Sequence, residues 1–180
     1  MPFLDLESPR LYFRPLDLRD LPALNDVFSG PKAICLRPDE GSHVNEGCVE
    51  SRVNALLFRR HTPGRSLWWA AIDKNTQKAV GVAFFHDVPG DKALIEVGCH
   101  MLPSHQGKGL ASEALRMVVR ASFTVLQERK VSVRTPADDP AAQRVVEKLG
   151  FTECGCVEIS GKPHRRYELS SDAFPPKVLD

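Results

Sequence analysis

The sequence lacks the features that place a protein in a membrane, on a secretory route or on a nucleic acid. None of its apolar stretches approaches the roughly 20 residues needed to cross a bilayer. Its first residues have neither the cationic start nor the apolar segment of a signal peptide. Its 24 Lys and Arg are balanced by 23 Asp and Glu, and the net charge of +1 provides no broad field for a polyanion. We therefore expect a cytoplasmic protein without membrane contact, and the charge disfavours nucleic acid binding.

Cysteine is present but forms no recognisable motif. The five cysteines are odd in number and include no Cys-x-x-Cys pair, which zinc and redox sites commonly use. Cys154 and Cys156 have the spacing of one strand face, but no histidine stands at metal-ligand spacing from them. The sequence predicts reduced thiols and no metal site.

What remains is a chain of ordinary composition that is long enough to bury a core. It has 180 residues, of which 42% are hydrophobic and 26% charged. We expect one domain over residues 1–180, with a loose tail at 171–180.

The hydrophobic pattern changes between strand and helix periods along the chain. Strand-type runs are predicted at residues 11–15, 67–72, 79–85, 93–102, 130–134, 154–159 and 166–169. Helical spacing is predicted after Asp17, around 49–57, at 110–125, and at 141–149 before Gly150. Short turns between the three runs from 67 to 102 favour an antiparallel meander. The order predicts a mixed α/β fold with about seven strands.

The most informative segment joins the run at 93–102 to the helix at 110–125. It reads Gln106-Gly-Lys-Gly-Leu-Ala111. Free amides at a helix N-terminus attract phosphate, and glycine lets the backbone approach it closely. Lys108 adds a flexible cation. Glycine spacing alone is equally typical of a plain turn from strand to helix.

Two common phosphate motifs do not fit this loop. Walker A requires Ser or Thr after Gly-Lys, but Lys108 is followed by Gly109. The dinucleotide fingerprint requires a third glycine or alanine where Ser112 stands, and it belongs to a βαβ unit, not a meander. The loop is therefore neither a P-loop nor a Rossmann turn.

Further segments occur together with this loop in one known family. They are Ser8-Pro-Arg-Leu-Tyr-Phe-Arg-Pro-Leu16, Ile95-Glu-Val-Gly-Cys-His-Met-Leu102, Gly107-Lys-Gly-Leu-Ala-Ser-Glu-Ala-Leu115 and Val145-Val-Glu-Lys-Leu-Gly-Phe151. With the loop pattern Gln/Arg-x-x-Gly-x-Gly/Ala, they resemble the GNAT superfamily of acyl-CoA-dependent N-acetyltransferases. The similarity is greatest to the branch of ribosomal-protein alanine N-acetyltransferases.

The resemblance implies a fold and a site for acetyl-CoA. The fold is a mostly antiparallel sheet with flanking helices and a central parallel pair, strands 96–102 and 131–134, that splays to hold the pantetheine arm. Where the branch often has Asn before Pro, this chain has Asp139, which keeps the acceptor oxygen but loses the amide donor. The resemblance implies that ten residues contact acetyl-CoA, and Asp139 is one of them. They are His100, Met101, Gln106, Gly107, Lys108, Gly109, Leu110, Ala111, Ser112 and Asp139.

Two residues are candidates for proton transfer. An amine must lose a proton before it attacks a thioester, and Glu96 can accept that proton directly or through water, as a strand glutamate does in related enzymes. The structural alternative is that Glu96 only pairs with an Arg or Lys. The family's usual proton donors to the thiolate are replaced by Val146 and Ala142. Tyr167 is the remaining candidate, although a thiol with a pKa of roughly 8.5 can leave with only water nearby.

These residues predict an N-acetyltransferase that moves an acetyl group from acetyl-CoA to a primary amine by direct attack in a ternary complex. Cys99 is interpreted as channel lining, because direct transfer needs no enzyme nucleophile. The acceptor stays open between a protein N-terminus and a small amine, and the assembly between monomer and homodimer. The missing proton donors favour one alternative, a non-catalytic acyl-CoA-binding or interaction module. A third hypothesis, an RNA binder, is disfavoured by the charge.

Overall fold

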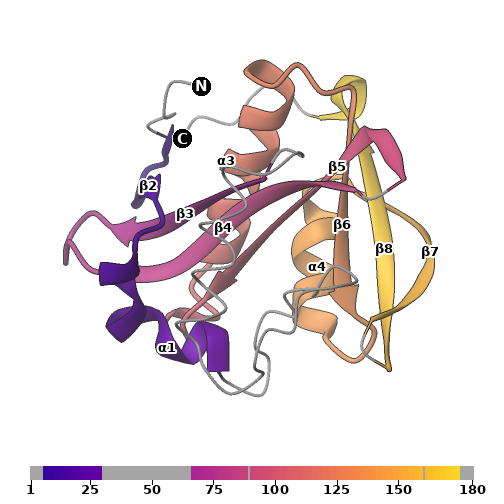
Figure 1. Cartoon of the computed structure of the whole chain (residues 1–180). Coiled ribbons are helices and arrows are strands. Elements are labelled where there is room, and N and C mark those ends of the chain that lie inside the picture. The colour runs from indigo at the N-terminus through magenta and orange to yellow at the C-terminus, as the bar shows by residue number, and fades with distance from the viewer. Residues whose placement is uncertain (1–5, 30–65, 89, 160, 175–180) are drawn as a thin grey trace.

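The computed structural model describes residues 6–29, 66–88, 90–159 and 161–174, and its strands form one sheet (Figure 1). Within these ranges the sheet has eight strands in the order β1-β2-β3-β4-β5-β6-β8-β7. The strands are β1 (Leu6–Glu7), β2 (Leu11–Pro15), β3 (Ser66–Asp73), β4 (Ala79–Val88), β5 (Asp91–Met101), β6 (Lys130–Pro136), β7 (Thr152–Ile159) and β8 (Lys162–Ser170). All neighbours pair antiparallel except β5 and β6.

Three α-helices lie within the described residues, together with short 3₁₀ turns. The α-helices are α1 (Leu21–Ser29), α3 (Leu110–Thr124) and α4 (Pro140–Lys148), and the 3₁₀ turns are η1 (Leu18–Asp20), η3 (Pro103–His105) and η4 (Ser171–Ala173). Asp17 caps η1 through a bond from the Arg19 amide, and Gly150 follows α4 with a left-handed φ of +93°. No helix in these ranges is both long and apolar enough to cross a membrane.

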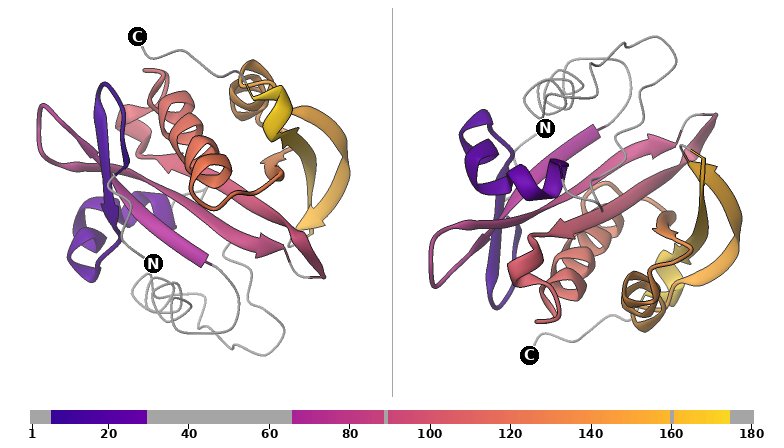
Figure 2. Two further views of the ribbon diagram at one scale, coloured as in Figure 1. Left: turned by 90° about the horizontal axis from the view of Figure 1, so that it is seen from above. Right: turned by 90° about the horizontal axis from the view of Figure 1, so that it is seen from below.

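The helices cover the two faces of the sheet (Figure 2). α3 and α4 pack on one face, over a core that includes Trp69, Val97, Val133 and Tyr167. α1 packs on the other face, where Trp68 stacks on Phe84 with ring centroids 4.2 Å apart. The adjacent tryptophans therefore face opposite ways, as strand geometry requires.

The structure confirms the mixed, mostly antiparallel fold, with one strand more than expected. The additional strand is β1, which has only two residues and is too short to show a strand period in the sequence. The helix predicted around 49–57 lies outside the described residues. At the start of the predicted tail, η4 forms and the Phe174 ring packs on Phe123 with centroids 5.5 Å apart.

β5 and β6 separate soon after they meet. Their parallel register consists of Ile95 opposite Val131 and Glu96 opposite Ser132. The Ser132 hydroxyl donates to the Ile95 carbonyl at 3.2 Å. Beyond this point β5 runs on to Met101 and β6 to Pro136 without pairing to each other, and the strands diverge (Figure 1). The predicted splayed parallel pair is therefore confirmed.

Candidate functional site

The loop between β5 and α3 presents backbone amides at the start of a helix. Gly107 and Gly109 have left-handed φ angles of +73° and +79°, which favour glycine. The first hydrogen bond of the helix runs from the Glu113 amide to the Gly109 carbonyl at 3.2 Å. In the described part of the chain, no acceptor takes the amides of the three residues before Glu113, which are Leu110, Ala111 and Ser112. These donors and the positive end of the helix dipole can bind an anion.

Gln106 ties this loop to the end of β5. Its side-chain amide donates to the Met101 carbonyl at 3.1 Å. Met101 is one of the residues implied to contact acetyl-CoA, and its carbonyl already accepts this hydrogen bond, so one lone pair remains. The Gln106 side chain thus shapes the loop from within, while residues 106–109 are exposed.

The turn between β1 and β2 braces the same loop. Arg10 donates from Nη1 to the Lys108 carbonyl at 2.9 Å and from Nε to Glu113 Oε2 at 2.8 Å. The Arg10 amide and the Ser8 hydroxyl both donate to Glu113 Oε1, at 2.8 and 2.6 Å. Burial raises the pKa of Glu113, but these hydrogen bonds outweigh it and leave the pKa below its usual value. Nothing in the sequence indicates this brace, because its partners stand about a hundred residues apart.

His100 on β5 lies close enough to Asp139, at the N-cap of α4, for the two to interact electrostatically. Burial lowers the pKa of His100 to about 4, although the Asp139 carboxylate opposes the shift. His100 is therefore neutral at pH 7. Asp139 caps α4 by accepting from the Ala142 amide at 3.1 Å, a task that needs only an acceptor oxygen. The capping bond explains why an aspartate fits before Pro140, where the related enzymes often have an asparagine.

Glu96 sits where β5 and β6 part. Its neighbours Ile95 and Val97 belong to the core under α3, so that strand alternation turns Glu96 to the α1 face. Arg134 Nη2 lies 2.5 Å from Glu96 Oε2, and His86 Nε2 lies 3.8 Å from the same oxygen. Both members of the Glu96–Arg134 pair are largely buried, with side chains 13% and 14% exposed. The ion pair that the sequence left open as an alternative is therefore present.

Tyr167 lies on the opposite face of the sheet from Glu96. It is fully buried in the core under α3 and α4, in register with Val133. Burial raises the pKa of its phenol, and the neighbouring Thr135 side chain opposes that shift, although neither hydroxyl makes a hydrogen bond of good geometry among the described residues. Proton donation by Tyr167 stays a prediction.

The surroundings of Cys99 favour its thiol form over the thiolate. Its Sγ donates to the Ala111 carbonyl at 3.3 Å, and burial raises its pKa to about 12. A thiol in that state is a poor nucleophile. No group of His, Cys, Asp or Glu suited to a metal ion is found in the described ranges.

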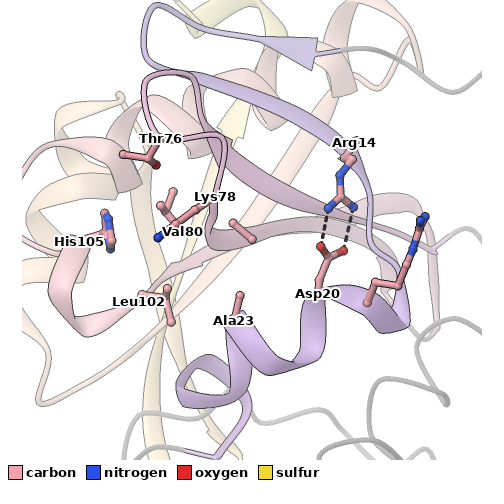
Figure 3. Close-up of a pocket in the computed structure, with 10 residues that line it drawn as sticks. Arg14, Asp20, Ala23, Thr76, Lys78, Val80, Leu102 and His105 are labelled. Atoms are coloured by element: carbon pink, nitrogen blue, oxygen red, sulfur yellow. Dashed lines mark hydrogen bonds and ion pairs between the residues drawn. The ribbon is translucent and has the colours of Figure 1, made fainter.

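A separate hollow of about 370 Å³ opens beside η3 on the α1 side (Figure 3). Arg14 and Asp20 pair across one part of it at 2.5 Å, while Lys78 and His105 line another part. None of the predicted site residues lines this hollow, so it is distinct from the predicted site.

A diverging parallel pair beside an anion-binding helix start is the arrangement expected for binding an acyl-CoA. Residues 10–152 match the family model of the acetyltransferase (GNAT) domain. The chain therefore belongs to the GNAT acetyltransferase family, as the sequence motifs predicted, and it is an enzyme of the N-acetyltransferase class.

Individual relatives agree with this assignment. The uncharacterized N-acetyltransferase YoaA of Bacillus subtilis is 25% identical over 153 residues, covering 84% of this chain and 85% of YoaA. The spermidine N(1)-acetyltransferase of Vibrio cholerae is 36% identical over 99 residues, covering 55% of this chain and 57% of that protein. The ribosomal-protein-serine acetyltransferase of Escherichia coli is 25% identical over 95 residues, covering 53% of this chain and 49% of that protein.

A solved structure shares the fold. The crystal structure of spermidine N-acetyltransferase from Vibrio cholerae, in complex with CoA and spermine, superposes with a TM-score of 0.73. The two chains are 19% identical, and the match covers 92% of this chain and 98% of the other. At this identity the likeness supports the fold alone.

Proposed function

We propose that this protein transfers an acetyl group from acetyl-CoA to a primary amine while both are bound. The observation that carries the proposal is the juxtaposition of two features of β5. Its pairing with β6 ends at Glu96, and its far end leads into the loop whose helix-start amides lack acceptors in the described chain. One strand thus connects a candidate base to a candidate phosphate site.

The residues present fit acetyl-CoA. The amides of Leu110, Ala111 and Ser112, with Lys108 beside them, suit the pyrophosphate. The edge of β5 that turns toward β6 after Glu96 has no strand partner, and it can pair with the amide groups of a pantetheine arm as an added strand would. When bound, acetyl-CoA supplies the acetyl group as a thioester.

The chain's own part in the reaction is to remove a proton and orient the amine. Glu96 accepts one proton from the amine, directly or through water, so that the nitrogen lone pair can attack. A nitrogen–carbon bond forms and the carbon–sulfur bond breaks. The attacking nitrogen releases its second proton to water, and the thiolate takes a proton from water or from Tyr167. Because the Cys99 thiol stays protonated, we propose direct transfer without an acyl-enzyme.

The acceptor is proposed to be a small amine or a protein N-terminus. Relatives named for each kind match about half of this chain. The test is a screen of purified protein with acetyl-CoA, using spermidine and peptides that begin with Ala or Ser, and following release of the CoA thiol. We expect at least one acceptor to release thiol well above the rate with water. Tight binding of acetyl-CoA with no release in the whole screen would instead support a binding module.

The role of Glu96 is tested with the acceptor that the screen selects. We expect Glu96→Gln to lower kcat by about a hundredfold to ten-thousandfold, the usual effect of losing a positioned base. Acetyl-CoA affinity should hardly change. The matched control is Glu153→Gln, which alters an ion-paired strand glutamate on β7 and should keep normal turnover. If Glu96→Gln folds and keeps full activity, Glu96 is only structural.

A further inference from the structure

Arg134 reaches across the opening between the two parallel strands to the candidate base. Its Nη2 lies 2.5 Å from Glu96 Oε2. We propose that Arg134 is a positioning residue, which holds the Glu96 carboxylate in the orientation needed to receive the acceptor amine. This inference rests on the proposed function, because it assigns a task to Arg134 only if Glu96 takes the proton.

The location of the ion pair gives it this task. The last paired position of β5 and β6 is Glu96 opposite Ser132, and Arg134 is the next residue of β6 on the same face. No backbone pairing joins the strands beyond that position, so the backbone of β6 does not hold the strands together there. The Glu96–Arg134 contact is a side-chain link where the strands diverge, next to the bond from the Ser132 hydroxyl to the Ile95 carbonyl.

The two carboxylate oxygens of Glu96 have different surroundings. The closest approaches of Arg134 and His86 to Glu96 are both to Oε2, at 2.5 and 3.8 Å. Within the residues that the structure describes, no hydrogen bond reaches Oε1. One oxygen is therefore anchored, and the other is available to accept a proton from an amine or from a bridging water.

An anchor of this kind has a physical benefit. A glutamate side chain has several rotatable bonds, and ordering it costs conformational entropy. An ion pair formed before the acceptor arrives has already met that cost, so the carboxylate is in place when the amine binds. The side chains are 13% and 14% exposed, and water screens such a pair less than it screens a surface pair.

The contact is one that a lysine could partly reproduce. The closest contact with Glu96 uses one amino group of the guanidinium, and Arg134 Nε is buried with no hydrogen-bond partner among the described residues. A lysine keeps the charge and a single donor, whereas a glutamine removes the charge. This difference separates an electrostatic anchor from a side chain that only fills space.

The experiment compares Arg134→Gln with Arg134→Lys, using the acceptor selected by the screen. We expect Arg134→Gln to lower kcat by roughly tenfold to a hundredfold, the scale on which misplaced catalytic groups lose rate. Arg134→Lys should recover most of that loss, and the acetyl-CoA affinity of both variants should match that of the unmodified protein. The matched control is Arg166→Gln, because Arg166 stands opposite Arg134 on β8 and pairs with Glu168 instead. It should keep normal kcat.

A double variant shows whether Arg134 acts through Glu96. In a Glu96→Gln background, adding Arg134→Gln should cause little further loss of kcat. Full activity of Arg134→Gln, additive losses in the double variant, or a lysine variant no better than glutamine would each overturn the proposal. If Arg134→Gln does not fold by circular dichroism, Arg134→Met, which keeps the buried stem, replaces it.

The failures of the two proposals look different. If Glu96→Gln is fully active, the base assignment fails, and the positioning role fails with it. If Glu96→Gln is inactive while Arg134→Gln is normal, only the positioning role is wrong.

Discussion

Arg10 and Glu113 join the turn between β1 and β2 to the first turn of α3. Their side chains meet at 2.8 Å, and Arg10 also donates to the Lys108 carbonyl within the glycine loop. The Glu113 amide makes the first hydrogen bond of the helix. The contact with Arg10 therefore fixes the start of α3 relative to the sheet. The helix-start amides proposed to bind pyrophosphate depend on that placement.

We expect Arg10→Met to weaken acetyl-CoA binding about fivefold. Exposed hydrogen bonds and ion pairs contribute about 1 kcal/mol or less, which corresponds to that factor. Calorimetric titration with acetyl-CoA measures the change. Arg19→Met is the control, because Arg19 pairs with Asp17 on the surface, away from the loop. Equal affinity of the two variants would show that the brace does not shape the phosphate site.

Glu113 should make stability depend on pH. Its pKa is lowered in the folded protein, mainly by the hydrogen bonds from Ser8 and Arg10 that outweigh burial. Its ionised form therefore stabilises the fold at neutral pH, and this contribution is lost as the pH falls below the ordinary value of 4.5.

Glu113→Gln should lower the free energy of unfolding by about 1 kcal/mol at pH 7. The difference from the unmodified protein should shrink as the pH falls below 4.5, because the carboxyl group of the unfolded chain gains a proton before the native one does. Urea unfolding at pH 7 and pH 3 measures both differences. A gap that stays constant over this range would mean that the Glu113 charge contributes nothing.

Cys99 should not form an acetyl-enzyme. With a pKa of about 12, it is protonated at any pH the protein tolerates. We expect Cys99→Ala to change turnover by less than about tenfold, whereas loss of a true nucleophile costs roughly a millionfold in a hydrolase. Mass spectrometry after mixing with acetyl-CoA should find no acetyl group on Cys99. In alkylation at pH 8, exposed Cys154 and Cys156 should react before Cys99.

Tyr167→Phe separates packing from proton donation. The variant removes a buried hydroxyl whose polar neighbour is the Thr135 side chain, so the free energy of unfolding should change by less than about 1 kcal/mol. If water protonates the thiolate, turnover should fall less than about tenfold. The control is Tyr12→Phe, which removes a surface hydroxyl that donates to Gln77. A large loss of turnover with unchanged acetyl-CoA affinity would instead make Tyr167 the general acid.

Much of the architecture was predictable because the signals that determine it are local. β3 and β4 are continuous apolar runs of strand length bounded by turn residues, and α3 carries a clear apolar stripe, so the type of each element follows from its own residues. The glycine loop was equally readable, since Gly107 and Gly109 adopt the left-handed angles that glycine favours. The two-residue strand β1 was missed because a period needs more residues than it has.

The sequence by itself determined the family, the mixed sheet and the phosphate-type loop, because these follow from neighbouring residues and short motifs. Only the tertiary structure decided what the side chains meet. Arg134 lies 38 positions from Glu96, and Arg10 lies 103 positions from Glu113. Chain folding brings each pair together, and spacing within the sequence does not indicate which cation faces which carboxylate. Tyr167 shows the same limit, because the face it occupies depends on the register of β8 with β6.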